Sequence, residues 1–237
     1  MPVDIQRSSE RGVSELGWLH SRFSFSFADY YNPKRMGFGA LRVLNDDIIG
    51  PGAGFGMHPH SNYEIVTIVL EGALEHADSM GNRGIIRAGE VQCMSAGRGV
   101  MHSEHNASAE DKAILLQVWV KPDTVGAEPR YSQAKLSEAG MEGKLAEIVS
   151  GNRGVSGPLK IRQDARFLLG NIGSGAKAVF SASGEGKGAY VFVVSGAVKI
   201  GNERLSGRDA AGITGEKSFE IAAEKNSTVL VIEVPME

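Results

Sequence analysis

The sequence has a single cysteine, Cys93, among its 237 residues. An intrachain disulfide framework is therefore excluded, so a packed core must supply the stability, and a hydrophobic content of 42% is enough to build one. No stretch approaches the roughly 18 to 20 consecutive apolar residues of a membrane-spanning helix. Residues 1–12 also lack the apolar segment of a signal peptide. We expect a cytoplasmic chain with no membrane contact, in which Cys93 is a buried, unreactive thiol.

An excess of charge of one sign is also missing. Lys and Arg number 25, Asp and Glu number 28, the net charge is -3, and neither sign forms a long run. Surfaces that bind nucleic acids or anionic membranes concentrate positive charge. The sequence therefore argues against direct nucleic-acid binding. It shows no feature typical of a subunit interface either, and we expect a monomer.

Signals for helices are scarce, whereas glycine is abundant, with 31 residues spread along the chain. Short runs rich in Val, Ile, Phe and Tyr lie between the glycines, which is typical of short strands joined by tight turns in a β-sandwich or β-barrel. The clearest predicted strands are 23–27, 64–70, 113–120, 190–194 and 227–234. Candidates for short helices are confined to 133–139 and 165–169. The sequence predicts an all-β protein.

The apolar alternation is interrupted between Pro122 and Pro158 by a polar segment of mixed charge, which we interpret as a linker. The parts on either side resemble each other. Residues 68–74, an apolar strand followed by a glycine turn and a returning strand, correspond to residues 192–198. Such internal similarity indicates a duplicated unit. We therefore predict β units at residues 1–122 and 158–237, joined by a linker over 123–157.

All six histidines precede this linker, and three of them fall in two short motifs, His58-Pro59-His60 and His102-Ser103-Glu104. Residues two apart in a strand project to the same face, so each motif can direct two side chains at one point. Two such strands side by side would bring together three imidazoles and a carboxylate. This ligand set suits a divalent first-row metal and leaves coordination positions open.

The spacing leaves the carboxylate ligand open. Glu64 lies four residues after His60 and would share its face if the strand continued, so Glu64 and Glu104 are both candidates. His76 and His105 are candidates for the surroundings of the site, although a solvated side chain is the simpler interpretation of both. His20 is left without a role.

Two longer patterns resemble the cupin motifs. In the first, Gly52 is followed by the His58-Pro59-His60 motif, Glu64 and Gly72, and in the second, Gly89 is followed by residues 95–102 and Asn106. The details resemble pirin and the pirin-like bacterial quercetin 2,3-dioxygenases in particular, in segments 17–23, 29–33, 36–39, 55–60, 70–74 and 78–82. The resemblance spans essentially the whole chain and is stronger in residues 10–122.

This resemblance implies a bicupin, with two antiparallel β-barrels of the jelly-roll type in one chain and a metal in the N-terminal barrel only. It implies His58, His60, His102 and Glu104 as the metal ligands, and so favours Glu104 over Glu64, which would turn away or support the site. We expect Fe²⁺, while zinc, nickel, manganese, cobalt and copper accept the same ligands.

For activity, the resemblance implies a flavonol such as quercetin as the substrate, held through its 3-hydroxyl and the neighbouring carbonyl. O2 would be inserted, the heterocyclic ring would open and carbon monoxide would be released. Glu104 is the candidate catalytic residue, as the general base for the hydroxyl proton. The alternative is a metal-dependent regulatory or binding protein without turnover, as some pirins are, and the sequence leaves both open.

Overall fold

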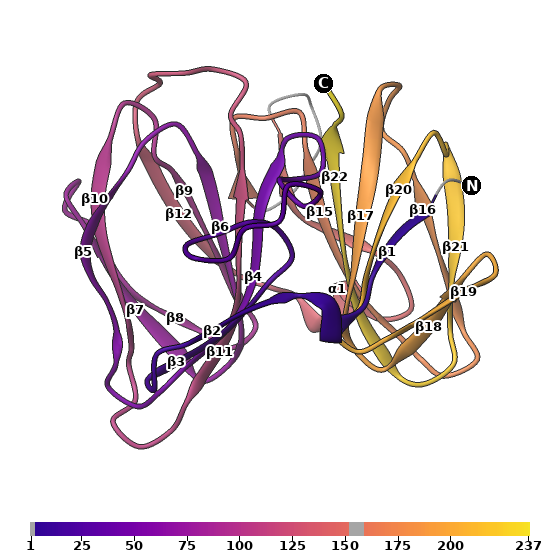
Figure 1. Ribbon diagram of the computed structural model, residues 1–237, viewed down its shortest axis with the longest axis horizontal. Helices are drawn as coiled ribbons and strands as arrows, with labels where there is room; N and C mark the ends of the chain where they lie inside the picture. Colours follow the sequence, from indigo (N-terminus) through magenta and orange to yellow (C-terminus); the bar gives the residue numbers. More distant parts are fainter. Residues whose placement is uncertain (1–2, 152–158) are drawn as a thin grey trace.

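The computed structural model describes residues 3–151 and 159–237 and is almost entirely β-structure. Figure 1 shows two β units side by side, the first in indigo to magenta and the second in orange to yellow. Each unit contains one seven-stranded and one four-stranded sheet. The all-β bicupin expected from the sequence is confirmed.

The first unit carries the histidines. Its seven-stranded sheet has the order β12-β9-β6-β11-β4-β3-β2. These strands are β2 (Gly12–Glu15), β3 (Leu19–Phe23), β4 (Leu41–Ile49), β6 (Glu64–Glu71), β9 (Glu90–Ser95), β11 (Ala113–Val120) and β12 (Arg130–Lys135). The four-stranded sheet has the order β5-β10-β7-β8, formed by β5 (Gly54–His60), β7 (Ala73–Asp78), β8 (Arg83–Arg87) and β10 (Val100–Asn106). Both histidine motifs therefore lie on adjacent strands of the smaller sheet.

The second unit repeats this plan. Its larger sheet has the order β1-β20-β17-β22-β15-β13-β14, and its smaller sheet has the order β16-β21-β18-β19. The strands are β1 (Val3–Gln6), β13 (Ala146–Ser150), β14 (Leu159–Lys160), β15 (Arg166–Ile172), β16 (Lys177–Ser181), β17 (Lys187–Ser195), β18 (Ala197–Ile200), β19 (Glu203–Ser206), β20 (Ala210–Thr214), β21 (Ser218–Ala223) and β22 (Ser227–Pro235). The pair β16–β21 occupies the place of β5–β10 and contains no histidine, so the second unit has no counterpart of the histidine motifs.

The N-terminal strand crosses between the two units. β1 pairs with β20 in the second unit, with Val3 opposite Ile213, and the chain then passes through the 3-10 helix η1 (Ser8–Glu10) into β2 of the first unit. Figure 1 shows this indigo segment running from one unit to the other. The chain therefore ties the units together at its start as well as through residues 121–151.

The largest cluster of buried apolar side chains contains residues of both units. Val66 and Leu116 of the first unit share this cluster with Phe192 and Leu230 of the second, and all four are fully buried. Successive side chains of a strand alternate between two faces, so the other faces of these sheets line separate cores inside each unit. Burial of each such side chain contributes roughly 1.5–3 kcal/mol. The two units are therefore packed against each other through a shared core.

Cys93 belongs to this shared core and is 2% exposed. Loss of hydration raises the pKa of its thiol well above the ordinary value. Because the thiolate is the reactive form, the expectation of a buried, unreactive cysteine is supported.

Three local predictions differ from the structure. Phe23 ends β3, and Phe27 forms only an isolated bridge with Tyr30, so the predicted strand 23–27 is wrong beyond its first residue. Of the predicted helix at 133–139, residues 133–135 end β12, and only 138–139 fall in a short helix, α1 (Glu138–Met141). The predicted helix at 165–169 lies in β15. In the two predicted helices, pairing with a neighbouring strand overrides a weak local pattern.

The predicted linker, 123–157, also contains structure. β12 pairs with β9 in the first unit, and β13 pairs with β15 in the second. Residues 152–158 of this segment lie outside the described residues. No helix in the described parts of the chain is both long enough and apolar enough to span a membrane.

Candidate metal centre

The pairing of β5 with β10 brings the two histidine motifs together. In this antiparallel pair His102 lies opposite His58, and Val100 lies opposite His60. The ring centroids of His58, His60 and His102 are 4.4–4.8 Å from one another. A ligand nitrogen from each ring lies within 4.8 Å of the other two. The strand spacing recognised in the sequence therefore converges three imidazoles on one point.

The surroundings of His58 and His102 suit metal ligands. The His58 Nδ1 lies 2.8 Å from the carbonyl oxygen of Gly56, so a proton on Nδ1 is donated to this oxygen and the Nε2 lone pair is free. The His102 ring is 1% exposed, and neither of its nitrogens has a hydrogen-bond partner within the described chain. A buried polar group without a partner is costly. A divalent cation bound to His102 would remove this deficit, so the donor set fits a metal.

The electrostatics also favour neutral imidazoles, which is the form that binds metals. Burial, together with the neighbouring His58 ring, lowers the pKa of His60 to about 4. Burial, and then the adjacent histidines, lower the pKa of His102 to about 2. Both rings are therefore unprotonated at neutral pH and keep their lone pairs available.

Glu104 lies beside this triad but in a different group. A β-bulge between His102 and Glu104 shifts the register, so that Glu104 pairs with Phe55. Its carboxylate is grouped with His76 and His102, whose ligand atoms lie within 4.8 Å of one another. The structure thus brings together three of the four expected ligands, and places the fourth against one of them.

The Glu104 carboxylate is held inside the barrel. Nε2 of Gln117 donates to both of its oxygens at 3.2 and 2.9 Å, and Thr67 Oγ1 donates at 3.4 Å. Burial raises the pKa of Glu104 to about 7, and the nearby Asp47 adds to the increase while the Gln117 and Thr67 hydrogen bonds oppose it. A carboxyl group with this pKa can both accept and release a proton near neutral pH.

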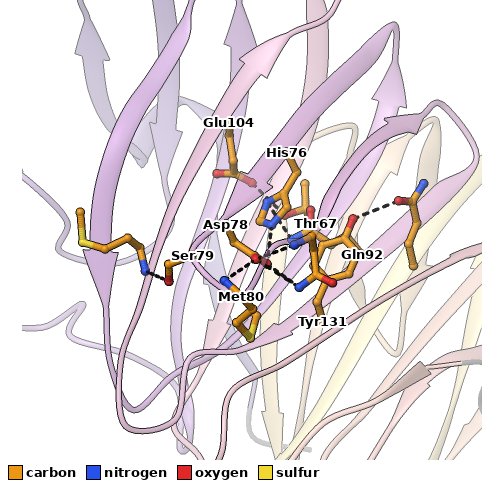
Figure 2. Close-up of polar contacts among 11 residues, drawn as sticks. Thr67, His76, Asp78, Ser79, Met80, Gln92, Glu104 and Tyr131 are labelled. Carbon is orange, nitrogen blue, oxygen red and sulfur yellow. Dashed lines mark hydrogen bonds and ion pairs between the residues drawn. The ribbon is translucent and has the colours of Figure 1, made fainter.

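His76 is fully buried, contrary to the interpretation of a solvated side chain. Nε2 of His76 lies 3.2 Å from Oδ2 of Asp78, and the ring stacks on Tyr131 with centroids 4.8 Å apart. Figure 2 shows the His76 ring between the carboxylates of Asp78 and Glu104. The sequence held a signal for this side chain, since His76 and Asp78 stand two apart on β7 like the residues of the two predicted motifs. The other histidine left open, His105, is half-buried and lies in neither group of candidate ligands among the described residues.

Glu64 is directed elsewhere. β5 ends at His60, and Asn62 adopts a left-handed conformation with φ of 53°, so the strand does not continue to Glu64. Glu64 begins β6 in the larger sheet, where its carboxylate accepts a 2.6 Å hydrogen bond from Ser95. The spacing that would have placed Glu64 on the face of His60 therefore does not apply. Glu64 is absent from both groups of candidate ligands in the described chain.

Aromatic side chains and a cavity border the triad. The His60 ring packs edge-on against Trp119 with centroids 4.8 Å apart, and Trp119 also contacts Tyr63 and Phe27. A cavity of about 400 Å³ lies next to His60, and its lining includes Met101 and Val100. The cavity is wide open to solvent, so a small molecule bound there would stay partly exposed.

Comparison with known proteins assigns both halves of the chain. Residues 5–120 match the family described as pirin, and residues 148–234 match the quercetinase C-terminal cupin domain. A quercetin 2,3-dioxygenase of Escherichia coli (strain K12) is 41% identical over 233 residues, covering 98% of this chain and 99% of that protein. The chain belongs to the pirin family. The resemblance noted in the sequence is therefore confirmed, and this pirin is a dioxygenase-like enzyme.

Solved pirin structures share the fold over the full length. The crystal structure of YhhW from Escherichia coli has a TM-score of 0.93 at 39% identity, with coverage of 99% of this chain and 98% of that one. A structure of the same bacterial pirin in complex with nickel(II) has a TM-score of 0.92 at 39% identity, with 99% of each chain covered. The fold of this chain is thus that of the pirin family, and its candidate metal centre agrees with the binding of a divalent metal by a related pirin.

Proposed function

We propose that this pirin is a metal-dependent dioxygenase that opens the heterocyclic ring of a flavonol-like substrate such as quercetin with O2. The observation that carries the proposal is the convergence of His58, His60 and His102 together with the unpartnered nitrogens of buried His102. The names of the full-length relatives support the substrate class and the reaction. Both atoms of O2 enter the products, and one ring carbon leaves as carbon monoxide.

His58, His60, His102 and Glu104 would hold the metal. Three imidazoles and a carboxylate leave positions open on a divalent ion, and the nickel(II) complex of a related pirin shows that its fold accepts such an ion. We favour Fe²⁺ for this chain. Once bound, the ion would act as a Lewis acid that eases deprotonation of a substrate hydroxyl and as a template for O2.

The protein's own groups would then position the substrate and move one proton. The open cavity beside His60 would receive the substrate, and Trp119, which packs against the His60 ring, would hold that ring in place. Glu104 would accept the hydroxyl proton, because its raised pKa suits proton transfer near neutral pH. Gln117, which bonds both carboxylate oxygens, would keep Glu104 in place when it is charged.

The test is anaerobic reconstitution of the purified chain with Fe²⁺, and separately with Ni²⁺, Mn²⁺, Co²⁺, Cu²⁺ and Zn²⁺, followed by quercetin and O2. We expect loss of flavonol absorbance with stoichiometric carbon monoxide for at least one metal. His58→Ala and Glu104→Gln should abolish this turnover, whereas His105→Ala, on the same strand as Glu104, should retain it. Full activity and full metal content in the first two variants would contradict the proposed site.

A metal-dependent regulatory protein is the alternative, and the same experiment separates the two. Tight metal binding without turnover for any metal would favour a regulatory role. The cytoplasmic location and the monomeric state expected from the sequence stay predictions, which cell fractionation and sedimentation would check.

A further inference from the structure

A second polar cavity lies where the N-terminal crossover meets both units, on the side of the larger sheet. Its volume is about 360 Å³, and its lining includes Arg11, His20, Arg22, Asp46 and Arg208. His20 and Arg22 lie on β3 and Asp46 lies on β4, whereas the candidate metal ligands lie on β5 and β10 of the smaller sheet. This cavity is therefore distinct from the metal centre.

The cavity carries an excess of positive charge. The Asp46 carboxylate lies 3.6 Å from Nη1 of Arg11 and 3.4 Å from Nε of Arg208, so one carboxylate is shared by two guanidinium groups. The side chain of Arg22 has no hydrogen-bond or ion-pair partner in the described chain. The Nδ1 of His20 lies 2.5 Å from a carboxylate oxygen of Glu15, so this ring already has a partner. Three guanidinium groups therefore face a single carboxylate.

Arg11 is the buried member of this group. The residue is 3% exposed, and its Nη2 donates to the carbonyl oxygens of Arg22 and Leu44 and to Ser24 Oγ at 3.1–3.3 Å. Its Nε has no hydrogen-bond partner among the described residues, and its Nη1 has only the ion pair with Asp46, at 3.6 Å and beyond hydrogen-bond distance. A buried guanidinium with unused donors is unfavourable unless a partner satisfies them. These donors point to a ligand that accepts hydrogen bonds and carries negative charge.

Arg208, which lines this cavity, has an unusual backbone conformation. Its φ is 71°, in the left-handed region that a residue with a Cβ rarely adopts. Its amide bonds the carbonyl oxygen of Val193 in β17, as the amide of Gly89 bonds that of Val69 in β6. The first unit therefore has glycine, with φ of 80°, at the position where the second has arginine. An arginine in a backbone conformation that favours glycine is consistent with a role for its side chain.

We propose that this cavity binds a small oxyanion, the phosphate or carboxylate group of a small molecule, through Arg11, Arg22 and Arg208. Guanidinium groups bind oxyanions through paired, charge-assisted hydrogen bonds. The Nη1 of Arg208 also lacks a hydrogen-bond partner in the described residues, so the anion would use donors of both units. A bound anion would thereby join the N-terminal crossover, β3 and the second unit.

The test is titration calorimetry of the full-length, metal-loaded chain with inorganic phosphate and, separately, with malonate. We expect saturable binding of at least one of them, and the tighter one identifies the phosphate or carboxylate class. Arg22→Gln and Arg208→Gly should each weaken binding about tenfold or more. Arg83→Gln, an exposed arginine on β8, should bind as the wild type does. Arg208→Gly should fold at least as stably as the wild type, because glycine adopts the left-handed conformation freely.

Metal content, measured on the same samples, separates the two sites. The arginine variants should keep the wild-type metal content. Saturable binding that survives in both arginine variants would place the anion at the metal and overturn the proposal. Failure of both phosphate and malonate to bind the wild type would overturn it as well.

Discussion

His102 lies directly opposite His58 in the pairing of β10 with β5, and their ring centroids are 4.4 Å apart. This pairing determines the geometry of the site, because the other two candidate ligands lie further along the same two strands. His60 follows along β5, and Glu104 follows along β10 after the bulge. The geometry therefore depends on the register of one strand pair.

Replacement of His102 by leucine should separate metal binding from folding. In the metal-free chain the His102 nitrogens are buried without partners, so His102→Leu should leave the melting temperature unchanged or raise it. The stabilisation that added Ni²⁺ or Fe²⁺ gives the wild type should disappear. Differential scanning calorimetry with and without metal measures both effects. A variant that retains metal-dependent stabilisation would exclude His102 as a ligand.

Replacement of Gly54 should disturb the β5–β10 register. A Cβ on Gly54 would lie 2.2 Å from the carbonyl oxygen of Glu104 and 2.4 Å from the Cα of His105, so the strands must separate. We expect Gly54→Ala to lower the free energy of unfolding by about 1–3 kcal/mol and to reduce the metal content. The matched control is Gly56→Ala on the same strand, where a Cβ meets no atom within 4 Å. Equal stability of the two variants in urea unfolding would contradict this account.

His76 should act by supporting the ligands. Its ring is fixed by Asp78 and Tyr131 and lies next to His102, with centroids 5.4 Å apart. Substitution of such neighbouring groups typically weakens metal affinity about 10–100-fold. We expect His76→Gln to bind metal within this range, measured by competition with a chelator, whereas His58→Ala should bind none. Complete loss of metal in His76→Gln would instead identify His76 as a ligand.

Asp47 should make the stability of the metal-free chain depend on pH. Burial raises its pKa from 3.8 to about 7, although a hydrogen bond from Ser21 opposes this. The folded state favours the protonated form of Asp47. The stabilisation that this preference contributes is complete below about pH 4 and is lost as the pH rises through 7. A difference of about three pKa units corresponds to at most about 4 kcal/mol.

Asp47→Asn tests this dependence, because asparagine cannot ionise. Between pH 4 and 8 the stability of the wild type should fall relative to that of Asp47→Asn, as measured by urea unfolding. Asp29→Asn, at an exposed position, should follow the wild type. Parallel curves for the wild type and Asp47→Asn would show that Asp47 ionises normally in the folded chain.

Much of the fold was predictable because long apolar strands carry strong patterns. Residues 64–70, 113–120, 190–194 and 227–234 all lie within strands of the structure. β12 was missed because it lies at the edge of its sheet, and its half-exposed, polar side chains lack a period-two apolar pattern. The pairing of β1 with β20 was also missed, because contacts between the two ends of a chain leave no local signal.

The candidate site was predictable where strand geometry alone decides it. The three histidines depend on period-two spacing, which the sequence displays directly. The turn at Asn62 was not visible, and it is this turn that removes Glu64 from the face of His60. The bulge after His102 was equally hidden, since it is a mismatch between two strands: the three steps from His58 to Phe55 on β5 face the two steps from His102 to Glu104 on β10.

The crossing of β1 has a consequence for the order of assembly during synthesis. Val3 leaves the ribosome long before its partner Ile213. The histidine-bearing barrel can complete its own sheets while β1 is still unpaired, whereas the second barrel must recruit a strand made long before. β1 is thus made before the strands of the first barrel but pairs only after β20 has been made.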